Sequence, residues 1–134
     1  MHGSIAFGEG CIVHPAAYID ARGGPITFGE YNILEEKTRI VNKVRGKDDK
    51  GNPILKEMKI GSYNLFETGC TVSTSEIGDY NEFSLKCFIE DNCRVGNNNY
   101  IGPRVALQVG SRLGDNKLVY EEDKILVNDD DTCV

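Results

Sequence analysis

A six-residue period of apolar residues runs through the second half of the chain. Each position in this run carries Ile, Val, Leu or Phe: Ile77, Phe83, Ile89, Val95, Ile101, Leu107, Leu113 and Val119. Because 40% of the residues are hydrophobic, such a run in a fixed frame has a chance of below about one in a thousand. A period of six fits neither an α-helix nor an alternating hairpin sheet. It is typical of hexapeptide β-helices, in which short strands and turns wind into a solenoid.

The same period covers most of the chain when interruptions are allowed, and three hexads make one coil. The apolar positions then form three columns. The first column is Phe7, Phe28, Ile60, Ile77, Val95 and Leu113. The second is Val13, Leu34, Phe66, Phe83, Ile101 and Val119, and the third is Ile19, Ile40, Val72, Ile89, Leu107 and Ile125. The sequence therefore predicts an all-β fold, a single-stranded left-handed parallel β-helix of about six coils that forms one domain over 1–134.

Two segments depart from the period and predict features outside the regular coils. The segment 42–58, NKVRGKDDKGNPILKEM, is charged, contains Gly and Pro and has no apolar period. We expect it to form a protruding, exposed and mobile loop. The last residues, 126–134, include the run Asp129–Asp131 and are expected to form an acidic tail in water. The shorter segment Arg22–Pro25 is expected to form a corner turn.

Four of the five cysteines share one position in the hexad, four residues after an apolar column residue. They are Cys11, Cys70, Cys87 and Cys93. This shared position indicates small packing residues in the solenoid wall. Cys70 and Cys87 are expected on successive coils, close enough for a disulfide, although free thiols are expected in a reducing compartment.

Two polar or aromatic columns stand at one predicted corner. Asn32, Asn64, Asn81 and Asn99 follow the first apolar column by four residues, and stacked Asn side chains can form a hydrogen-bonded structural ladder. Three of them are preceded by tyrosines that are expected to point outwards on consecutive coils: Tyr31, Tyr63 and Tyr80. This aromatic stripe is a candidate protein interface. The alternative is that the rings only stack on one another and support the corner.

The charge of the chain narrows the classes of partner. A net charge of −6 and a pI of about 4.9 argue against nucleic acid and against anionic membranes, since both need a basic surface. No apolar run approaches the length of a membrane span, and the first residues lack the pattern of a signal peptide. We therefore expect a cytoplasmic protein without membrane insertion.

Candidate catalytic residues are scarce in this sequence. The known activities of hexapeptide β-helices depend on histidine, as a general base in acyltransferases or as three zinc ligands in γ-class carbonic anhydrases. The only histidines are His2 and His14, which cannot supply a three-histidine site. The adjacent pairs Glu35–Glu36 and Glu121–Glu122 are expected to face opposite sides of a strand. We expect no catalytic, metal or cofactor site.

Three segments carry a resemblance to a known family. They are Gly24–Glu36 (GPITFGEYNILEE), Ile60–Cys70 (IGSYNLFETGC) and Ile77–Asn81 (IGDYN). Together with the charged loop between the first two, they resemble the dynactin subunit 6 family over roughly residues 5–125. That family usually continues into an α-helix after the last coil, whereas the present sequence ends at Val134.

The resemblance implies a left-handed β-helix with a non-catalytic role at the pointed end of dynactin. The implied partners are dynactin subunit 5, the pointed-end actin-related protein and a larger zinc-binding subunit. The implied setting is the cytoskeleton, where dynactin supports dynein-driven transport along microtubules and cargo attachment. No cofactor is implied.

The leading hypothesis is thus a structural and interaction subunit. A rival is an enzyme of the hexapeptide group, either a trimeric acyltransferase or a zinc enzyme similar to γ-class carbonic anhydrase. A third reading is a degenerate enzyme homologue that binds a small ligand between coils. Bound zinc, acyl-CoA turnover and a strict homotrimer would distinguish the enzyme from the scaffold.

Overall fold

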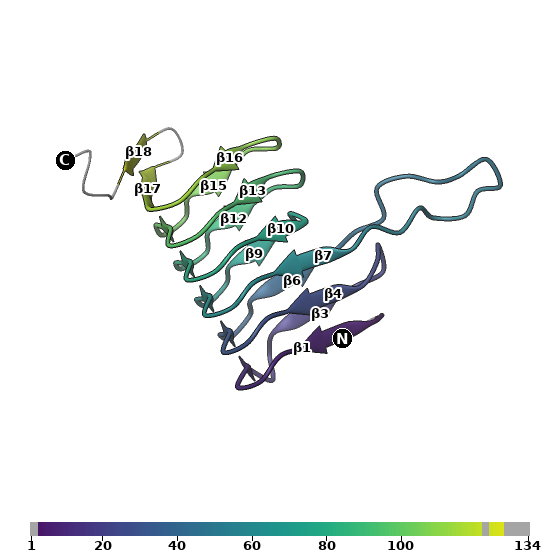
Figure 1. Cartoon of the computed structure of the whole chain (residues 1–134), viewed down its shortest axis with the longest axis horizontal. Coiled ribbons are helices and arrows are strands. Elements are labelled where there is room, and N and C mark those ends of the chain that lie inside the picture. Colours follow the sequence, from purple (N-terminus) through teal and green to yellow (C-terminus); the bar gives the residue numbers. More distant parts are fainter. Residues whose placement is uncertain (1–2, 122–123, 128–134) are drawn as a thin grey trace.

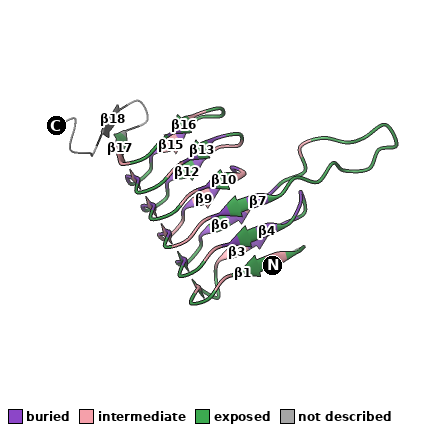
Figure 2. Ribbon diagram, in the orientation of Figure 1, coloured by how far each residue is buried: buried purple, intermediate pink, exposed green. Residues whose placement is uncertain are grey.

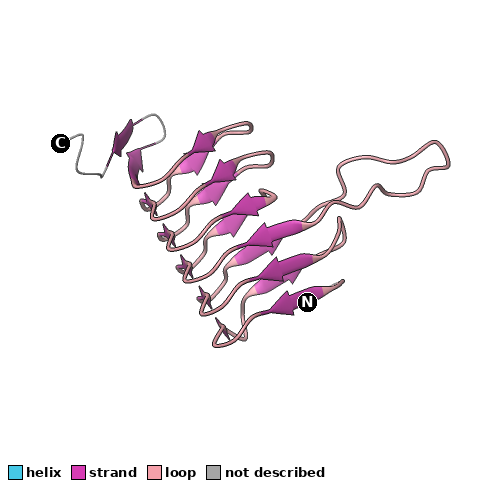
Figure 3. Cartoon of the chain, viewed as in Figure 1, coloured by secondary structure: helices cyan, strands magenta, loops and turns pink. Residues whose placement is uncertain are grey.

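The chain winds into a parallel β-solenoid of about six turns. The computed structural model describes residues 3–121 and 124–127, and no helix occurs within these residues (Figure 3). Each of the first five turns contributes one short strand to each of three sheets, so that strands of one sheet lie above one another along the stack (Figure 1). The predicted all-β, β-helical fold is confirmed.

The three sheets are named here in the order in which the chain enters them. The first sheet contains β1 (Ile5–Phe7), β4 (Ile26–Phe28), β7 (Met58–Ile60), β10 (Glu76–Ile77), β13 (Arg94–Val95) and β16 (Arg112–Leu113). The second contains β2 (Ile12–Val13), β5 (Ile33–Leu34), β8 (Leu65–Phe66), β11 (Glu82–Phe83), β14 (Tyr100–Ile101), β17 (Lys117–Glu121) and β18 (Lys124–Val127). The third contains β3 (Tyr18–Asp20), β6 (Arg39–Val41), β9 (Thr71–Val72), β12 (Phe88–Ile89) and β15 (Ala106–Leu107).

The hexad columns predict the strand register. Ile60 pairs with Ile77 in the first sheet, and Phe66 pairs with Phe83 in the second. These column residues are buried, while the residues beside them in the strands are partly buried or exposed (Figure 2). This alternation is expected where column residues point into the solenoid and their neighbours point outwards. Phe7 and Val13 depart from this rule: Phe7 is 36% exposed and Val13 is partly buried, because both lie on the first coil and no coil covers them from below.

Aromatic side chains stack inside the solenoid with the spacing of the coils. The rings of Phe66 and Phe83 are parallel, with 4.8 Å between their centroids, and both are fully buried. Phe7 and Phe28 stack in the same way at 4.7 Å. The repeat of the backbone thus sets ring distances that favour contact between neighbouring coils.

Glycine follows several column residues because neighbouring coils approach closely there. A Cβ atom added to Gly78 would lie 2.5 Å from the carbonyl oxygen of Gly96, and one added to Gly96 would lie 2.6 Å from that of Gly114. Gly114 itself would meet nothing within 4 Å. The requirement for glycine therefore comes from the coil above, and it ends where the regular stack ends.

The predicted packing role of the cysteines is confirmed. Cys70, Cys87 and Cys93 are buried in the wall, Cys11 is partly buried, and all four are free thiols. The thiol of Cys87 lies 3.3 Å from the sulfur of Cys70. Burial raises the pKa of Cys70 well above its usual value, and the contact with Cys87 and the charge of Glu67 add to this.

The last coil ends differently from the expectation. Ile125 was expected in the third column, but it lies in β18, which pairs antiparallel with β17 and places Ile125 opposite Val119 in the second sheet. The hexad frame cannot distinguish these arrangements, because an antiparallel strand also alternates apolar and polar residues. The run Asp129–Asp131 lies outside the described residues.

The predicted loop leaves the solenoid between β6 and β7 and projects from the stack (Figure 1). The loop is slightly shorter than expected, since Asn42 and Met58 are buried in the wall. Residues 43–57 are exposed except for Arg45, which is partly buried. The carboxylate of Asp48 accepts hydrogen bonds from the backbone N–H groups of Lys50 and Asn52, which shapes the tip.

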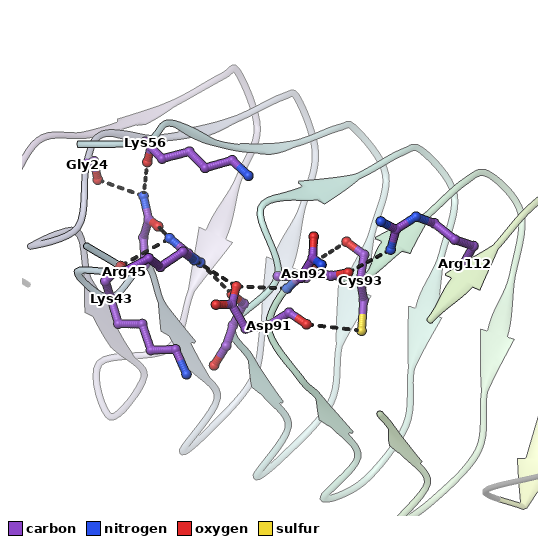
Figure 4. A network of polar contacts seen from close by, with 11 residues as sticks. Gly24, Lys43, Arg45, Lys56, Asp91, Asn92, Cys93 and Arg112 are labelled. Carbon is purple, nitrogen blue, oxygen red and sulfur yellow. Dashed lines mark hydrogen bonds and ion pairs between the residues drawn. The ribbon is translucent and has the colours of Figure 1, made fainter. Parts of the chain in front are cut away.

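The base of the loop is fixed to later coils by Arg45 (Figure 4). Its Nε donates to Asp91 Oδ1 at 2.7 Å, and its guanidinium also donates to the carbonyl oxygen of Ser73 at 2.8 Å and to the side-chain oxygen of Asn42. Burial raises the pKa of Asp91, but the hydrogen bonds from Arg45 and from the N–H of Asn92 outweigh this, so the pKa lies below its usual value.

Truncation of the aromatic stack should destabilise the solenoid strongly. Phe66→Ala removes a fully buried ring that stacks on Phe83, so we expect a loss of about 3–5 kcal/mol in the free energy of unfolding. Urea denaturation followed by circular dichroism measures this loss. Val109→Ala is the control, since Val109 is 64% exposed and its truncation should change stability by less than about 0.5 kcal/mol. Equal losses of stability in Phe66→Ala and Val109→Ala would contradict the assignment of Phe66 to the core.

Acid should weaken the anchor at the base of the loop. The pKa of Asp91 is depressed in the folded state, so its stabilising contribution is complete above the unfolded value of about 3.9 and is lost as the pH falls through the folded value. Between about pH 6 and about pH 3, the wild type should therefore lose more stability than Asp91→Asn. Denaturation at both pH values gives the comparison, and equal losses in the two proteins would refute the role of this carboxylate.

Candidate protein-interaction surface

Three tyrosines line one corner of the solenoid, between the first and second sheets. Tyr31, Tyr63 and Tyr80 occupy the same place on consecutive coils and are 42%, 48% and 60% exposed. Their rings stack, with centroids 5.4 Å apart between Tyr31 and Tyr63 and 4.8 Å apart between Tyr63 and Tyr80. Stacking and exposure therefore occur together, and we call this set the tyrosine column.

The backbone at these tyrosines adopts the left-handed region, with φ between 56° and 60°. The same place on the next two coils carries Asn98 and Asn116, with φ of 58° at both. Asn tolerates this conformation better than most residues, whereas a bulky residue raises the conformational energy of the backbone there. Mutual stacking offsets part of that cost. The fold alone would be served by Asn at every coil.

Two carboxylates, those of Glu9 and Glu30, lie near the tyrosine column. Burial raises the pKa of Tyr63, and the charges of Tyr80, Tyr31, Glu30 and Glu9 raise it further. The phenol of Tyr63 therefore stays neutral at physiological pH, beside acidic side chains. Carboxylates beside exposed tyrosines are suited to a basic side chain of a partner, which can form an ion pair there.

The asparagines that follow these tyrosines form a ladder of side chain to backbone hydrogen bonds. Asn81 Oδ1 accepts from the N–H of Asn99 at 3.0 Å, and Asn81 Nδ2 donates to the carbonyl oxygen of Gly96 at 2.8 Å. The same two bonds recur along the stack at Asn32, Asn64 and Asn99. All four side chains are buried, so the ladder holds each corner onto the next coil.

An apolar outer face on the second sheet adjoins the tyrosine column. Its residues are paired neighbours on successive strands: Ile12, Ile33, Leu65, Glu82, Tyr100 and Leu118. Ile12 is 62% exposed, Ile33 is 36% exposed and the rest are partly buried. Burial raises the pKa of Glu82, with the charge of Glu67 as a second cause, as expected for a carboxylate set among apolar side chains.

This face was missed by the sequence analysis, although a signal for it exists. Each of these residues directly precedes a member of the second apolar column, so it must point outwards when that member points inwards. Ile33 follows Tyr31 by two residues, and both point outwards. The tyrosine column and the outer face thus form one surface, named here the aromatic–apolar surface.

The structure assigns His14 to a turn. Its Nδ1 accepts a hydrogen bond from the backbone N–H of Ala16 at 2.9 Å, and the side chain is exposed. His2 lies outside the described residues. Within residues 3–121 and 124–127, no group of three or more His, Cys, Asp or Glu side chains is placed to hold a metal ion. None of the described residues belongs to a helix that could cross a membrane.

Comparison with characterised proteins gives consistent relatives. The chain is 32% identical to dynactin subunit 6 of Xenopus tropicalis over 126 residues, which cover 92% of this chain and 62% of that protein. It is 35% identical to dynactin subunit 6 of Caenorhabditis elegans over 95 residues, covering 71% and 48% of the two chains. The chain is a homologue of dynactin subunit 6. The resemblance inferred from the motifs is thereby confirmed.

Dynactin subunit 6 of Danio rerio shows a similar relation, with 30% identity over 90% of this chain and 63% of that protein. The present chain thus spans about three-fifths of the length of the vertebrate relatives it matches. No protein-family profile matches the chain.

Removal of one rung should show how much the asparagine ladder contributes. Asn81→Ala leaves the N–H of Asn99 and the carbonyl oxygen of Gly96 without their partner, so we expect a loss of about 2–4 kcal/mol in the free energy of unfolding. Asn52→Ala is the matched control in the exposed loop and should change stability by less than about 0.5 kcal/mol. Urea denaturation of both variants tests this, and a loss below about 1 kcal/mol for Asn81→Ala would refute the structural role.

Proposed function

We propose that this protein is a non-catalytic structural and interaction subunit of dynactin. Homology to dynactin subunit 6 over nine-tenths of the chain is the observation that carries the proposal. The fold is consistent with it, since a β-solenoid is a rigid body that presents flat sheets and corners to partners. In this role the protein acts in the cytoplasm, associated with the cytoskeleton, and supports dynein-driven transport and cargo attachment at the pointed end.

The proposed contact is the aromatic–apolar surface, with dynactin subunit 5 as its partner. Exposed tyrosines beside aliphatic side chains are the composition that protein interfaces favour. Tyr31, Tyr63 and Tyr80 are held in one geometry by stacking, so little side-chain entropy remains to be lost on binding. The pointed-end actin-related protein and the larger zinc-binding subunit are further proposed partners.

Substitution of the tyrosine column by asparagine should abolish the contact while the fold persists. Asn occupies the same left-handed position at Asn98 and Asn116, so the triple variant Tyr31→Asn/Tyr63→Asn/Tyr80→Asn keeps a compatible backbone. We expect its affinity for purified dynactin subunit 5 to fall at least about tenfold in isothermal titration calorimetry. Circular dichroism verifies that the variant retains its strands.

The control replaces three left-handed residues at the next corner: Lys37→Asn/Lys86→Asn/Arg104→Asn. It makes the same exchange of large side chains for Asn, and it should leave the affinity within about twofold of the wild type. If the tyrosine variant binds dynactin subunit 5 as tightly as the wild type does, the proposed interface is refuted. Light scattering that shows a homotrimer, together with stoichiometric zinc, would refute the subunit role in favour of a hexapeptide-repeat enzyme.

A further inference from the structure

A cleft of about 400 Å³ lies along one edge of the first sheet. The tyrosine column lies along the opposite edge of that sheet. It runs beside the starts of β7, β10, β13 and β16, where the chain passes from the third sheet to the first. The returning limb of the loop forms one wall through Lys56 and Glu57. The cleft therefore joins the regular wall to the base of the protruding loop.

The charge of this cleft is opposite in sign to that of the whole chain. Its charged residues are Lys56, Lys59, Arg94, Arg112, Glu57 and Glu76, four cations and two anions, which leaves a net +2. The chain as a whole carries −6. A positive cleft on an acidic protein attracts anionic groups to one place and repels them from most others.

Two of the four cations are neutralised within the cleft. Arg94 pairs with Glu76 at 3.0 Å, and Lys59 lies 3.6 Å from Glu57. Arg112 instead donates to carbonyl oxygens, the nearest being that of Asn92 at 2.6 Å (Figure 4). Carbonyl groups leave the charge of Arg112 uncompensated.

The ammonium group of Lys56 pairs with no carboxylate in the part of the chain that the structure describes. Arg94 and Arg112 are directly paired residues of neighbouring strands, one strand spacing of about 4.8 Å apart. Glu76 already compensates the charge of Arg94, so an anion in the cleft would be attracted chiefly by Arg112 and Lys56.

The backbone that presents Lys56 is held in place before any ligand arrives. The N–H of Lys56 donates to the carbonyl oxygen of Gly23 at 2.8 Å, and its carbonyl oxygen accepts from Asn42 Nδ2 at 2.7 Å. Asn42 also bonds to Arg45, which is tied to Asp91. The loop base thus fixes the backbone of Lys56 relative to the solenoid wall, so that only its side chain remains to be ordered on binding.

We infer that this cleft binds an acidic linear segment, rich in Asp and Glu, of a partner protein. From β7 to β16 the cleft spans three strand spacings, about 14 Å, which an extended peptide covers with about four or five residues. A carboxylate of this segment would meet the guanidinium group of Arg112, which binds carboxylates in a bidentate manner, and another would meet the ammonium group of Lys56. The inference concerns a surface separate from the aromatic–apolar surface and does not depend on membership of dynactin.

A titration of the ¹⁵N-labelled full chain with a hexaglutamate peptide tests the inference by NMR. We expect saturable shifts of the backbone amides of Ser75, Asn92, Arg94 and Arg112, which line the cleft. The shifts should diminish as NaCl is raised from about 50 to about 500 mM. Lys56→Gln/Arg112→Gln should weaken binding about tenfold.

Three comparisons make the outcome decisive. Lys56→Gln alone should weaken binding without altering the fold, since that side chain donates no structural hydrogen bond among the described residues. Lys50→Gln removes the same charge at the loop tip and should leave the affinity unchanged. Absence of shifts in the cleft, or equal binding by the double variant, would overturn the inference. Equal shifts with inorganic phosphate at lower concentration would also overturn it, in favour of a simple anion site.

Discussion

Hydrogen bonding between successive coils is the interaction on which the whole structure depends. Most strands have only two or three residues and would not persist alone, so each is held by the strands above and below it. Parallel pairing in register places identical positions of the repeat directly over one another. Each Phe, Asn, Gly or Tyr of a column therefore contacts the residue at the same position of the next coil. The identity of that residue decides what kind of contact forms.

The repeat explains why so much of the fold could be predicted from the sequence. A period of six reports which side chains point inwards, and that information fixes the sheets, the register and the apolar core. It does not report how the stack ends. Ile125 satisfies the period equally well in a further parallel coil or in the antiparallel hairpin that the chain adopts. The anchor from Arg45 to Asp91 joins residues 46 positions apart, and no periodic signal relates a loop residue to a later coil.

The candidate surfaces consist of residues at positions whose side chains are not determined by the hexad repeat. Outward positions beside the second column need only a residue compatible with a strand, and their apolar occupants, such as Ile12, therefore do not follow from the core. The tyrosines were visible in the sequence because they share a position with one another. The basic cleft was not, because its charges come from strand starts and from the loop, and only the folded chain brings Lys56 near Arg112.

The tyrosine column also shows where a partner contact would begin and end. Gly10 precedes it on the first coil, where an added Cβ would collide with the ring of Tyr31, and Asn98 follows it on the fifth. Three aromatic rings at about 4.8 Å per coil give a patch about 10 Å long, bounded at both ends by residues that suit a left-handed turn without strain. The aliphatic residues Ile33 and Leu65 lie beside the same coils. The strained tyrosines Tyr31 and Tyr63 thus lie on the same coils as Ile33 and Leu65, and this coincidence favours an interface over a purely structural stack.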